Sequence, residues 1–361
     1  MKSKVLAIIC FLFVGISCAN AQDIVRRLED TYPQKPVVKV SSKRINTKYV
    51  NSTLGVKYII KREKAKNLIV ESKNVYYYDV GASDYESENY IRFKSDKNGQ
   101  VGLYNDKGEI AVPAIYTDLS RVHNGMLYAL KGAEKENIGH DGDVHYMMVG
   151  GETLLLNTKG EVLIENMDTP SSYSLDMFSL KITEKPIENS YYKSYIGANG
   201  MYYNFVYLEA YFEHFVKHTF LPSTKDATWQ SFLTKNLVVN IEEEGEDVGN
   251  YIAMGIQPFI KEYLSSVTQI FDIVHSSEKN KYTLTYDVND WLSGMYNDEF
   301  EGEEAELYFN NGMWRVEEFP LFELNIKEVQ EDKTRSNHFQ FYRDKEGQMK
   351  LYKITIRANY Y

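Results

Sequence analysis

Cysteine is nearly absent from this chain. Its 361 residues include two cysteines, Cys10 and Cys18, and both lie in an N-terminal segment that we expect to be removed. The remainder can then form no disulfide and offers no thiolate as a nucleophile or metal ligand. A chain of this length does not require disulfides, because its hydrophobic core alone can make it stable.

The N-terminal segment is typical of a cleavable export signal. Positive charges at Lys2 and Lys4 precede an uncharged apolar run from Val5 to Ile16, and Ala19-Asn20-Ala21 supplies the small residues that a signal peptidase recognises. The apolar run is shorter than the roughly 20 residues that a membrane-spanning helix needs. We therefore expect a signal peptide over residues 1–21, cleaved between Ala21 and Gln22, and a periplasmic, cell-envelope or secreted protein.

Two alternatives to simple cleavage stay open. The segment could remain as an uncleaved anchor. The other alternative is a lipoprotein anchored through Cys18, because Ile16-Ser17-Cys18 resembles the end of a bacterial lipobox. Gly15 stands where that motif usually has leucine.

Clustered positive charge and long apolar runs are both missing from the body of the chain. Residues 79–361 carry 26 Lys and Arg against 46 Asp and Glu, whereas residues 22–78 carry 13 against 5. Neutralising phosphates requires clustered cations, so we expect no nucleic-acid partner. We expect the basic stretch, residues 22–78, to bind either an anionic surface or the acidic remainder of the chain itself. No later segment is apolar and long enough to predict a transmembrane helix.

The common catalytic signatures are missing as well. The sequence contains no glycine-rich phosphate loop, no G-x-S-x-G element and no H-E-x-x-H motif. We therefore predict no catalytic residues and no cofactor. The weak metal candidates are four neighbours, His140, Asp141, Asp143 and His145, but nothing nearby completes a coordination set, so we expect a solvated loop. His214 and His218 share a predicted helix face, but Phe215 stands where a metalloprotease helix has glutamate.

Aromatic residues are abundant, with 30 Tyr and 17 Phe. Runs such as Tyr76-Tyr77-Tyr78 and Tyr191-Tyr192 cannot all be buried, because neighbours on a strand point to opposite faces. Tyrosine combines an apolar ring with a hydroxyl and suits recognition surfaces. The sequence thus predicts a tyrosine-rich surface that binds a protein, a peptide or a glycan.

Short hairpins are predicted from residue 90 onward. Tyr90–Lys94 alternates apolar and polar residues like a half-buried strand, and the Asn-Gly pair at Gly99 indicates a hairpin turn. Val101–Tyr104 predicts the next strand. Asn105-Asp106-Lys107-Gly108 predicts a second turn, and Glu109–Val112 a third strand that Pro113 ends.

These residues resemble a known family. The stretch Asn98–Tyr116 is similar to one unit of the WG-repeat family of β-hairpin repeats, and Val149–Ile164 is similar to a second unit. The tryptophan of the family is Val101 here, and the second unit lacks the family's Pro-x-Tyr stretch. The resemblance covers about residues 90–185 and implies a repetitive β domain that acts as a scaffold or interaction module. It implies no catalytic residues.

The turn glycines carry a conformational prediction. Gly108 and Gly160 each follow Asn-x-Lys, so we expect both in a left-handed conformation that a Cβ atom would strain. Gly132 falls in the charged segment Lys131–Val144, an expected loop insertion, and should tolerate valine. Asn310-Asn311-Gly312 predicts a further hairpin turn.

The C-terminal half shows a different pattern. Residues 186–200 contain Pro, Asn, Gly and Ser and predict a linker. Residues 201–220 predict a long amphipathic helix, and residues 224–237 and 251–264 two more. Strands are expected from 267 onward, including 269–274 and 282–288. This order resembles NTF2-like domains, in which a bent sheet wraps a helix.

Together these patterns predict an α+β fold that is mainly β. We expect a signal peptide over 1–21, a WG-repeat-like β domain over 22–185, a linker over 186–200 and an α+β, NTF2-like domain over 201–361. The predicted function is that of an exported, non-catalytic binding protein. The alternative is an enzyme with an acid–base pocket in the C-terminal domain.

Overall fold

The structure is a computed structural model. It describes residues 47–52, 55–60, 68–71, 76–79, 82–84, 87–95, 97–105, 108–137, 146–168, 174–242, 250–276, 282–288, 307–310, 313–330 and 333–357. The predicted signal peptide, the four weak metal candidates His140, Asp141, Asp143 and His145, and Gly312 lie outside the described residues.

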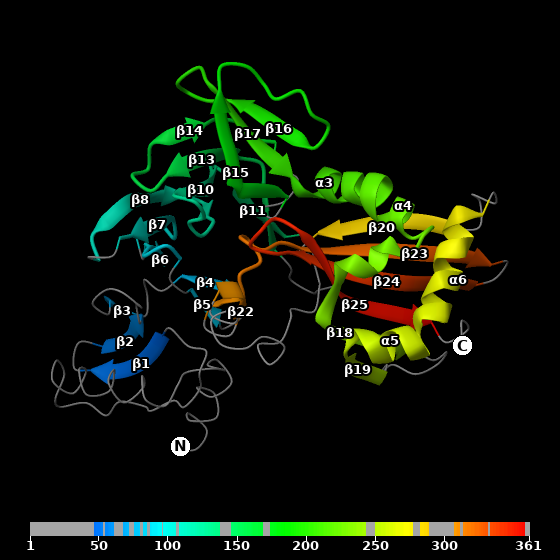
Figure 1. Ribbon diagram of the computed structural model, residues 1–361. Coiled ribbons are helices and arrows are strands. Elements are labelled where there is room, and N and C mark those ends of the chain that lie inside the picture. Colours follow the sequence, from blue (N-terminus) through cyan, green and yellow to red (C-terminus); the bar gives the residue numbers. More distant parts are fainter. Residues whose placement is uncertain are drawn as a thin grey trace.

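Strands dominate the described chain, which confirms an α+β fold that is mainly β. Small antiparallel sheets in the N-terminal part precede one six-stranded sheet flanked by helices (Figure 1). The small sheets are β1–β2–β3 (Thr47–Ser52, Gly55–Ile60, Leu68–Glu71), β4–β5 (Tyr77–Asp79, Ala82–Ser83), β6–β7–β8 (Ile91–Lys94, Val101–Tyr104, Ile110–Tyr116), β14–β13–β10–β9 (Val162–Ile164, Glu152–Asn157, Met126–Lys131, Asp118–Leu119), β11–β12 (Glu134–Asn137, Tyr146–Val149), β15–β17–β16 (Leu175–Thr183, Tyr202–Tyr207, Tyr192–Ile196) and β21–β22 (Phe309–Asn310, Met313–Trp314).

The central small sheet is buried on both faces. Leu127 and Leu154 on β10 and β13 pack into one apolar cluster with residues of β7 and β8. Their neighbours Tyr128 and Leu155 point the other way, into a second cluster with residues of β15 and β17. A short hairpin cannot bury a face alone, so consecutive hairpins stack on one another. This explains why β10 and β13 read as continuous apolar runs.

Two hairpin turns in this stack have the same geometry. In the first, Gly108 has φ of 79° and donates its amide to the Asn105 carbonyl at 3.0 Å, while the Asn105 side chain accepts from the Glu109 amide at 2.9 Å. In the second, Gly160 also has φ of 79°, and Asn157 and Glu161 repeat these bonds at 3.0 Å each. The pattern Asn-x-Lys-Gly-Glu thus encodes one turn type, since the αL position favours glycine.

Pro113 does not end its strand. β8 runs on to Tyr116, and its pairing with β7 shifts between Leu103↔Val112 and Val101↔Tyr116. The extra residues of β8 form a bulge that contains Pro113. The N–H group that proline lacks is therefore not needed for a hydrogen bond between β8 and β7.

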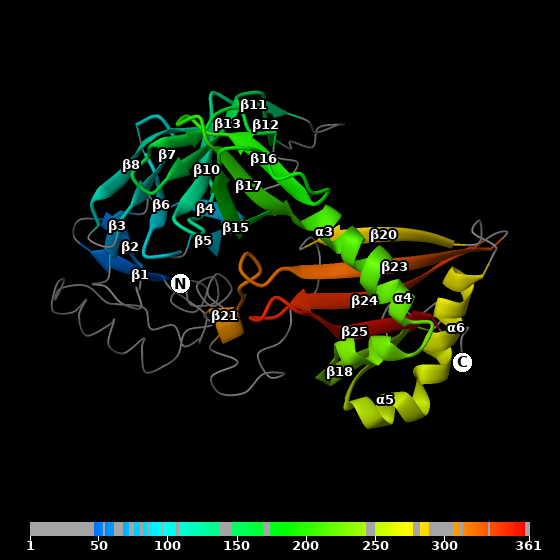
Figure 2. The same cartoon turned by 45° about the horizontal axis from the view of Figure 1, so that its top comes forward.

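The expected loop insertion at 131–144 contains a strand. β10 pairs with β13 and β11 pairs with β12 in one continuous register, from Lys131↔Glu152 to Glu134↔Val149. Gly132, Gly150 and Gly151 lie between the two ladders, all with positive φ. The β10–β13 hairpin therefore extends into a two-stranded arm, β11–β12, at the top of the view in Figure 2.

The segment 186–200, which was predicted to be a linker, contains a strand. β16 lies within it and pairs with β17 from Tyr192↔Val206 to Ile196↔Tyr202. The buried Asn204 side chain accepts hydrogen bonds from the Ile187 amide (3.0 Å) and the Ser194 hydroxyl (2.6 Å). Polar turn residues suggested a linker, but this buried asparagine ties the segment into a sheet.

The predicted long helix begins later than expected. Residues 202–207 form β17, and the helical segment begins at Leu208. It comprises α3 (Leu208–Phe215), a π-helical turn η2 (Val216–Phe220) and α4 (Leu221–Ser223), so it continues through Pro222. A π-helical turn widens the helix locally and accommodates the proline ring.

The C-terminal part is a six-stranded sheet with helices against one face. Its order is β19–β18–β25–β24–β23–β20 (Asn250–Met254, Leu233–Glu242, Met349–Arg357, Lys333–Arg343, Leu321–Gln330, Tyr282–Val288), antiparallel except where β18 runs parallel to β25. The other helices are the 3₁₀-helix η3 (Thr228–Phe232), α5 (Ile256–Glu262) and α6 (Leu264–His275).

Several element predictions in this part are wrong. The helix expected over 224–237 is η3 followed by β18, and that expected over 251–264 begins inside β19. The strand expected over 269–274 is the second half of α6, whose buried Val267, Ile270, Phe271 and Val274 recur at helical spacing. The interior strand β23 was not predicted from the sequence pattern.

The core of this part is aromatic. Phe212, Phe215 and Phe220 of the first helical segment pack against Phe322, Phe339 and Phe341 of the sheet, and all six are buried. Phe212 stacks on Phe322 with 4.9 Å between ring centroids, and Phe220 meets Phe341 edge-on at the same distance. The first helical segment therefore lies across β23 and β24, as Figure 2 shows.

Candidate functional site

The exposed histidines lie beside tyrosines rather than in a metal centre. The rings of His214 on α3 and His218 on η2 are 4.6 Å apart, and both residues are exposed. No group of three or more His, Cys, Asp or Glu residues in the described part of the chain could hold a metal ion. Among the described residues there is also no helix of sufficient length and hydrophobicity to cross a membrane.

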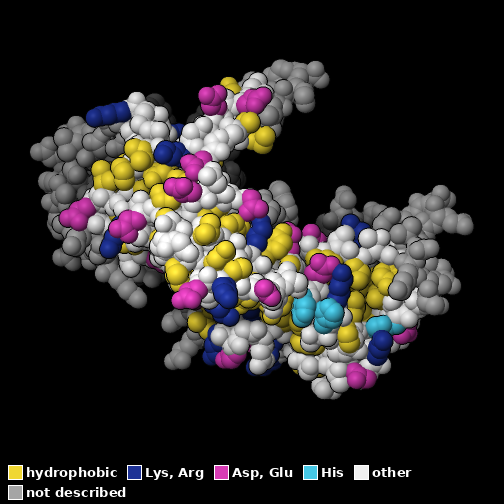
Figure 3. All heavy atoms as spheres, turned by 90° about the horizontal axis from the view of Figure 1, so that it is seen from above, with side chains coloured by type: hydrophobic (Ala, Val, Ile, Leu, Met, Phe, Trp, Pro, Cys, Tyr) yellow, Lys and Arg dark blue, Asp and Glu magenta, His cyan; other side chains and the backbone are white. Residues whose placement is uncertain are grey.

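A continuous series of ring contacts runs from β16 to these histidines. Tyr191 lies 5.5 Å from Tyr192, 5.7 Å from Tyr211 and 5.3 Å from His214, between ring centroids. Lys181 on β15 donates to the Tyr192 hydroxyl at 2.9 Å. We call Tyr191, Tyr192, Tyr211, His214, His218 and Lys181 the tyrosine patch. Figure 3 looks onto this face, where histidine and hydrophobic side chains gather over α3 and the β15–β17–β16 sheet.

The elements beneath the patch hold its rings in place. The three tyrosines are half-buried and rest on the core of the six-stranded sheet, and the ring of Tyr211 is 6.2 Å from that of Phe322. Asn204 fixes the strands below, because it is fully buried and its amide group bonds to β15, β16 and the backbone at Ile187. Burial raises the pKa of Tyr211. The hydrogen bond to Tyr192 raises the pKa of Lys181, which stays cationic at neutral pH.

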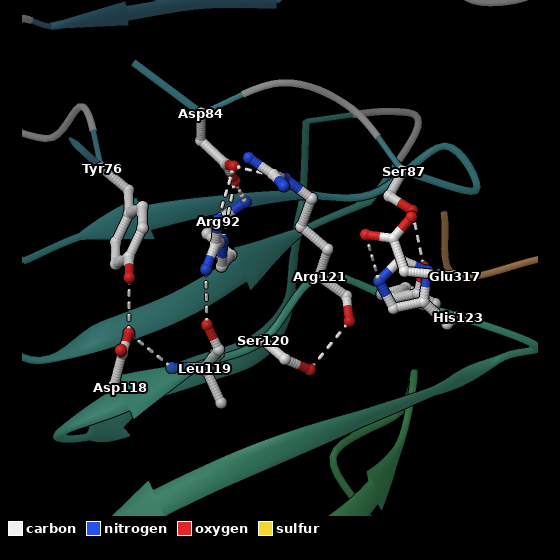
Figure 4. Close-up of polar contacts among 11 residues, drawn as sticks. Tyr76, Asp84, Ser87, Arg92, Asp118, Leu119, Ser120, Arg121, His123 and Glu317 are labelled. Carbon is white, nitrogen blue, oxygen red and sulfur yellow. Dashed lines mark hydrogen bonds and ion pairs between the residues drawn. The ribbon is translucent and has the colours of Figure 1, made fainter. Parts of the chain in front are cut away.

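A second polar cluster lies inside the N-terminal part (Figure 4). The Asp84 carboxylate, with 2% of its side chain exposed, faces two guanidinium groups: Arg92 Nη2 is 2.7 Å from Oδ1, and Arg121 Nε is 3.0 Å from it. The Arg92 backbone amide and Nε donate to Oδ2 at 3.1 and 2.9 Å. Burial by itself would raise the pKa of Asp84, but Arg92 and Arg121 outweigh it and hold that pKa below its usual value.

This cluster ties several strands together. Arg92 Nη1 also donates to the Leu119 carbonyl at 2.7 Å, and its guanidinium lies 4.1 Å from the Tyr76 ring centroid. The Tyr76 hydroxyl donates to Asp118 at 2.7 Å, and burial raises its pKa. The Asp84 carboxylate and its two arginine partners are buried or nearly so and face one another within the protein, which indicates a structural role.

The sequence pattern did not predict this cluster. Arg92 occupies a polar position in the alternating run Tyr90–Lys94, which predicted an exposed side chain, yet it is 8% exposed. An arginine inside a strand flanked by apolar residues was the available signal, because a buried guanidinium needs a carboxylate partner. Nothing in the sequence placed that partner at Asp84.

One ion pair and one histidine–carboxylate contact join the N-terminal part to the C-terminal part. Arg343 on β24 reaches Asp176 on β15 at 2.7 Å, and 2% of the Asp176 side chain is exposed. His123 Nε2 lies 3.6 Å from Glu317 Oε1, also drawn in Figure 4. Burial lowers the pKa of His123 despite the nearby Glu317. The Arg343–Asp176 pair therefore links the two parts by charge, whereas His123 and Glu317 lie side by side.

A third polar group lies on the face of the six-stranded sheet opposite the aromatic core. His338 Nδ1 lies 2.9 Å from Glu323 Oε1, and Gln340 donates to the other oxygen of Glu323. Asn325 donates to Asp287 at 2.6 Å. Burial alone would raise the pKa of Glu323, but the hydrogen bonds from His338 and Gln340 lower it. Partial burial and the charge of Glu323 raise the pKa of Asp287. The group combines an oriented imidazole with two carboxyls.

Comparison with known proteins does not name a family. No protein-family model matches the chain, and no curated protein sequence matches it. One similar solved structure is the "beta subunit of a putative aromatic-ring-hydroxylating dioxygenase" from Novosphingobium aromaticivorans DSM 12444. The similarity covers 42% of this chain and 88% of that chain, with 8% sequence identity and a TM-score of 0.19. A likeness at this level carries no argument about function.

Proposed function

We propose that this protein is an exported, non-catalytic binding protein of the cell envelope and that the tyrosine patch is its ligand surface. The single observation that carries the proposal is the series of ring contacts from Tyr192 through Tyr191 to Tyr211 and His214. Half-buried tyrosines held by a rigid sheet lose little entropy on binding. Their ring faces and hydroxyls suit a ligand that combines apolar surface with hydroxyl or amide groups, which describes a glycan or a peptide.

The proposal includes an architecture. Residues 90–185 would be WG-repeat-like hairpins, supported by the shared geometry of the turns at Gly108 and Gly160. The part from Leu208 onward would be an NTF2-like domain, supported by a helical segment lying across a mostly antiparallel sheet. Export would follow from the predicted signal peptide over residues 1–21.

The binding experiment compares one patch variant with one control. Tyr192→Ala removes a ring at the exposed end of the series, and Tyr146→Ala removes a ring that is 56% exposed on the β11–β12 arm. Soluble cell-wall oligosaccharides and unstructured peptides are the two probe classes, measured by calorimetric titration. We expect one class to bind, and Tyr192→Ala to weaken it at least about tenfold, as hot-spot tyrosines do. Wild-type protein that binds neither class, or equal loss in both variants, would refute the proposal.

A second candidate function rests on the Glu323–His338 pair. A carboxylate that orients an imidazole through one nitrogen leaves the other nitrogen available as a general base. This pair supports the alternative of an acid–base enzyme in the C-terminal part. The test is a screen of ester, amide and glycoside substrates with wild type and His338→Gln. Activity that disappears in this variant, with no change in melting temperature, would favour the enzyme over the binding protein.

A further inference from the structure

The two strands of the β11–β12 arm differ in chemistry. β11 reads Glu134-Lys135-Glu136-Asn137, whereas β12 reads Tyr146-Met147-Met148-Val149 and carries no charge. The four β12 residues are 56%, 51%, 46% and 39% exposed, in chain order. Such a row of exposed apolar side chains on one strand marks an interaction site. Figure 3 shows the arm as a projection with hydrophobic and acidic side chains.

One edge of the arm lacks the usual protection. In the described structure β12 pairs with β11 alone, so its other edge presents unpaired backbone amides and carbonyls. Proteins protect such edges with charged side chains, and β11 has three of them. β12 has none. A two-stranded ribbon is also marginally stable in water, and an added strand would stabilise it.

We propose that β12 pairs antiparallel with β12 of a second copy of this chain. The two-fold axis would pass through Met147, giving a four-stranded sheet in the order β11–β12–β12–β11. In this register Met147 faces its own counterpart and Tyr146 faces Met148. These pairs are wholly apolar, so they would bury side chains that are exposed in a single chain. The proposal is independent of the tyrosine patch.

Like charges disfavour one other pairing of the arm, and open edges disfavour the second. If two copies paired through β11, Lys135 would face Lys135, and Glu134 would face Glu136, which places like charges opposite one another. Pairing β11 with β12 would leave open edges and produce a filament rather than a closed dimer. In the β12–β12 sheet the two β11 strands lie three strand spacings apart, about 14 Å. That separation exceeds the Debye length of about 8 Å at physiological salt, so their repulsion is screened.

The two faces of the arm are consistent with this pairing. Lys135, Asn137, Tyr146 and Met148 share one face, because Lys135 pairs with Met148 and Asn137 with Tyr146. On it the Lys135 ammonium lies 4.0 Å from the Tyr146 ring centroid. Despite this contact, Tyr146 stays largely exposed. Four residues make a small interface, so the dimer should form in a concentration-dependent way.

The experiment uses cross-linking at single introduced cysteines. In a full chain with Cys10→Ser and Cys18→Ser, a cysteine at the axis (Met147→Cys) should cross-link to its counterpart with a short bis-maleimide. Val149→Cys is the matched control, because it lies on the same strand and the same face. Its two copies would lie about 14 Å apart, two residues either side of the axis. We expect efficient cross-linking at 147 and background cross-linking at 149.

Sedimentation velocity supplies the second measurement. The wild-type chain should show a concentration-dependent dimer, and Met147→Lys, which places two ammonium groups on the axis, should weaken it at least about tenfold. Equal cross-linking at positions 147 and 149 would refute the register. A wild-type chain that stays monomeric at every concentration would leave the β12 edge to a strand of another protein and overturn the proposal.

Discussion

Replacing Asp84 with asparagine should be among the most destabilising single substitutions in the N-terminal part. Each carboxylate oxygen of Asp84 accepts two hydrogen bonds, Oδ1 from Arg92 Nη2 and Arg121 Nε, and Oδ2 from the Arg92 amide and Nε. An asparagine has one oxygen, so in either orientation two donors would face its NH₂ group. Both guanidinium groups would also lose their negative partner.

The expected magnitude follows from burial. Exposed side-chain fractions are 2% for Asp84, 8% for Arg92 and 13% for Arg121, so solvent can replace little of what is lost. Breaking a buried ion pair by removing one partner costs about 3–5 kcal/mol. Urea unfolding followed by far-UV circular dichroism measures the change. In the double variant Asp84→Asn, Arg92→Met the cost should be smaller than the sum of the single costs, because fewer buried charges lack a partner.

Acidity provides an independent check. The folded pKa of Asp84 lies below its unfolded value, so its contribution is complete above about pH 4 and is lost as the pH falls through the folded pKa. The stability difference between wild type and Asp84→Asn should therefore shrink below pH 4. A loss under about 1 kcal/mol at neutral pH, typical of exposed pairs, would show that the cluster is not a buried structural centre.

Three further predictions concern turns, the contact between the two parts and the corrected boundary. Gly108→Val and Gly160→Val should each lower the free energy of unfolding in urea by about 1–3 kcal/mol. The matched asparagine variants should lower it less, since asparagine tolerates positive φ. Gly132→Val was expected from the sequence to be silent, but it should also be destabilising because Gly132 has φ of 74°. Equal effects of valine and asparagine would contradict this. Arg343→Met should lower stability by about 3 kcal/mol by leaving Asp176 buried without a cation, whereas Lys345→Met, at an exposed pair with Glu346, should change it by less than about 0.5 kcal/mol. Limited proteolysis should spare Tyr192–Tyr207, since β16 and β17 are paired there; an early cut in that range would restore the linker prediction.

Local patterns determined much of the N-terminal fold. Asn-x-Lys-Gly-Glu specifies its turn through the asparagine side chain and the glycine at positive φ, all within five residues, so the turns at Gly108 and Gly160 could be predicted. The strand at 282–288 and the mainly β composition also follow from local alternation and β-branched runs. The functional surface was predicted only as a composition, namely many tyrosines that could not all be buried.

Tertiary structure decided the rest, because the deciding contacts are distant in sequence. Residues 202–207 look helical by apolar spacing, yet β15 and β16 pair with them on both sides and make them a strand. Arg92 looks exposed by alternation, yet Asp84 and the Leu119 carbonyl bury it. The tyrosine patch likewise exists only because α3 carries Tyr211 and His214 to the end of β16, where Tyr191 meets both. Spacing along the chain specifies which face a side chain takes within one element, whereas long-range pairing specifies which elements form and what that face contacts.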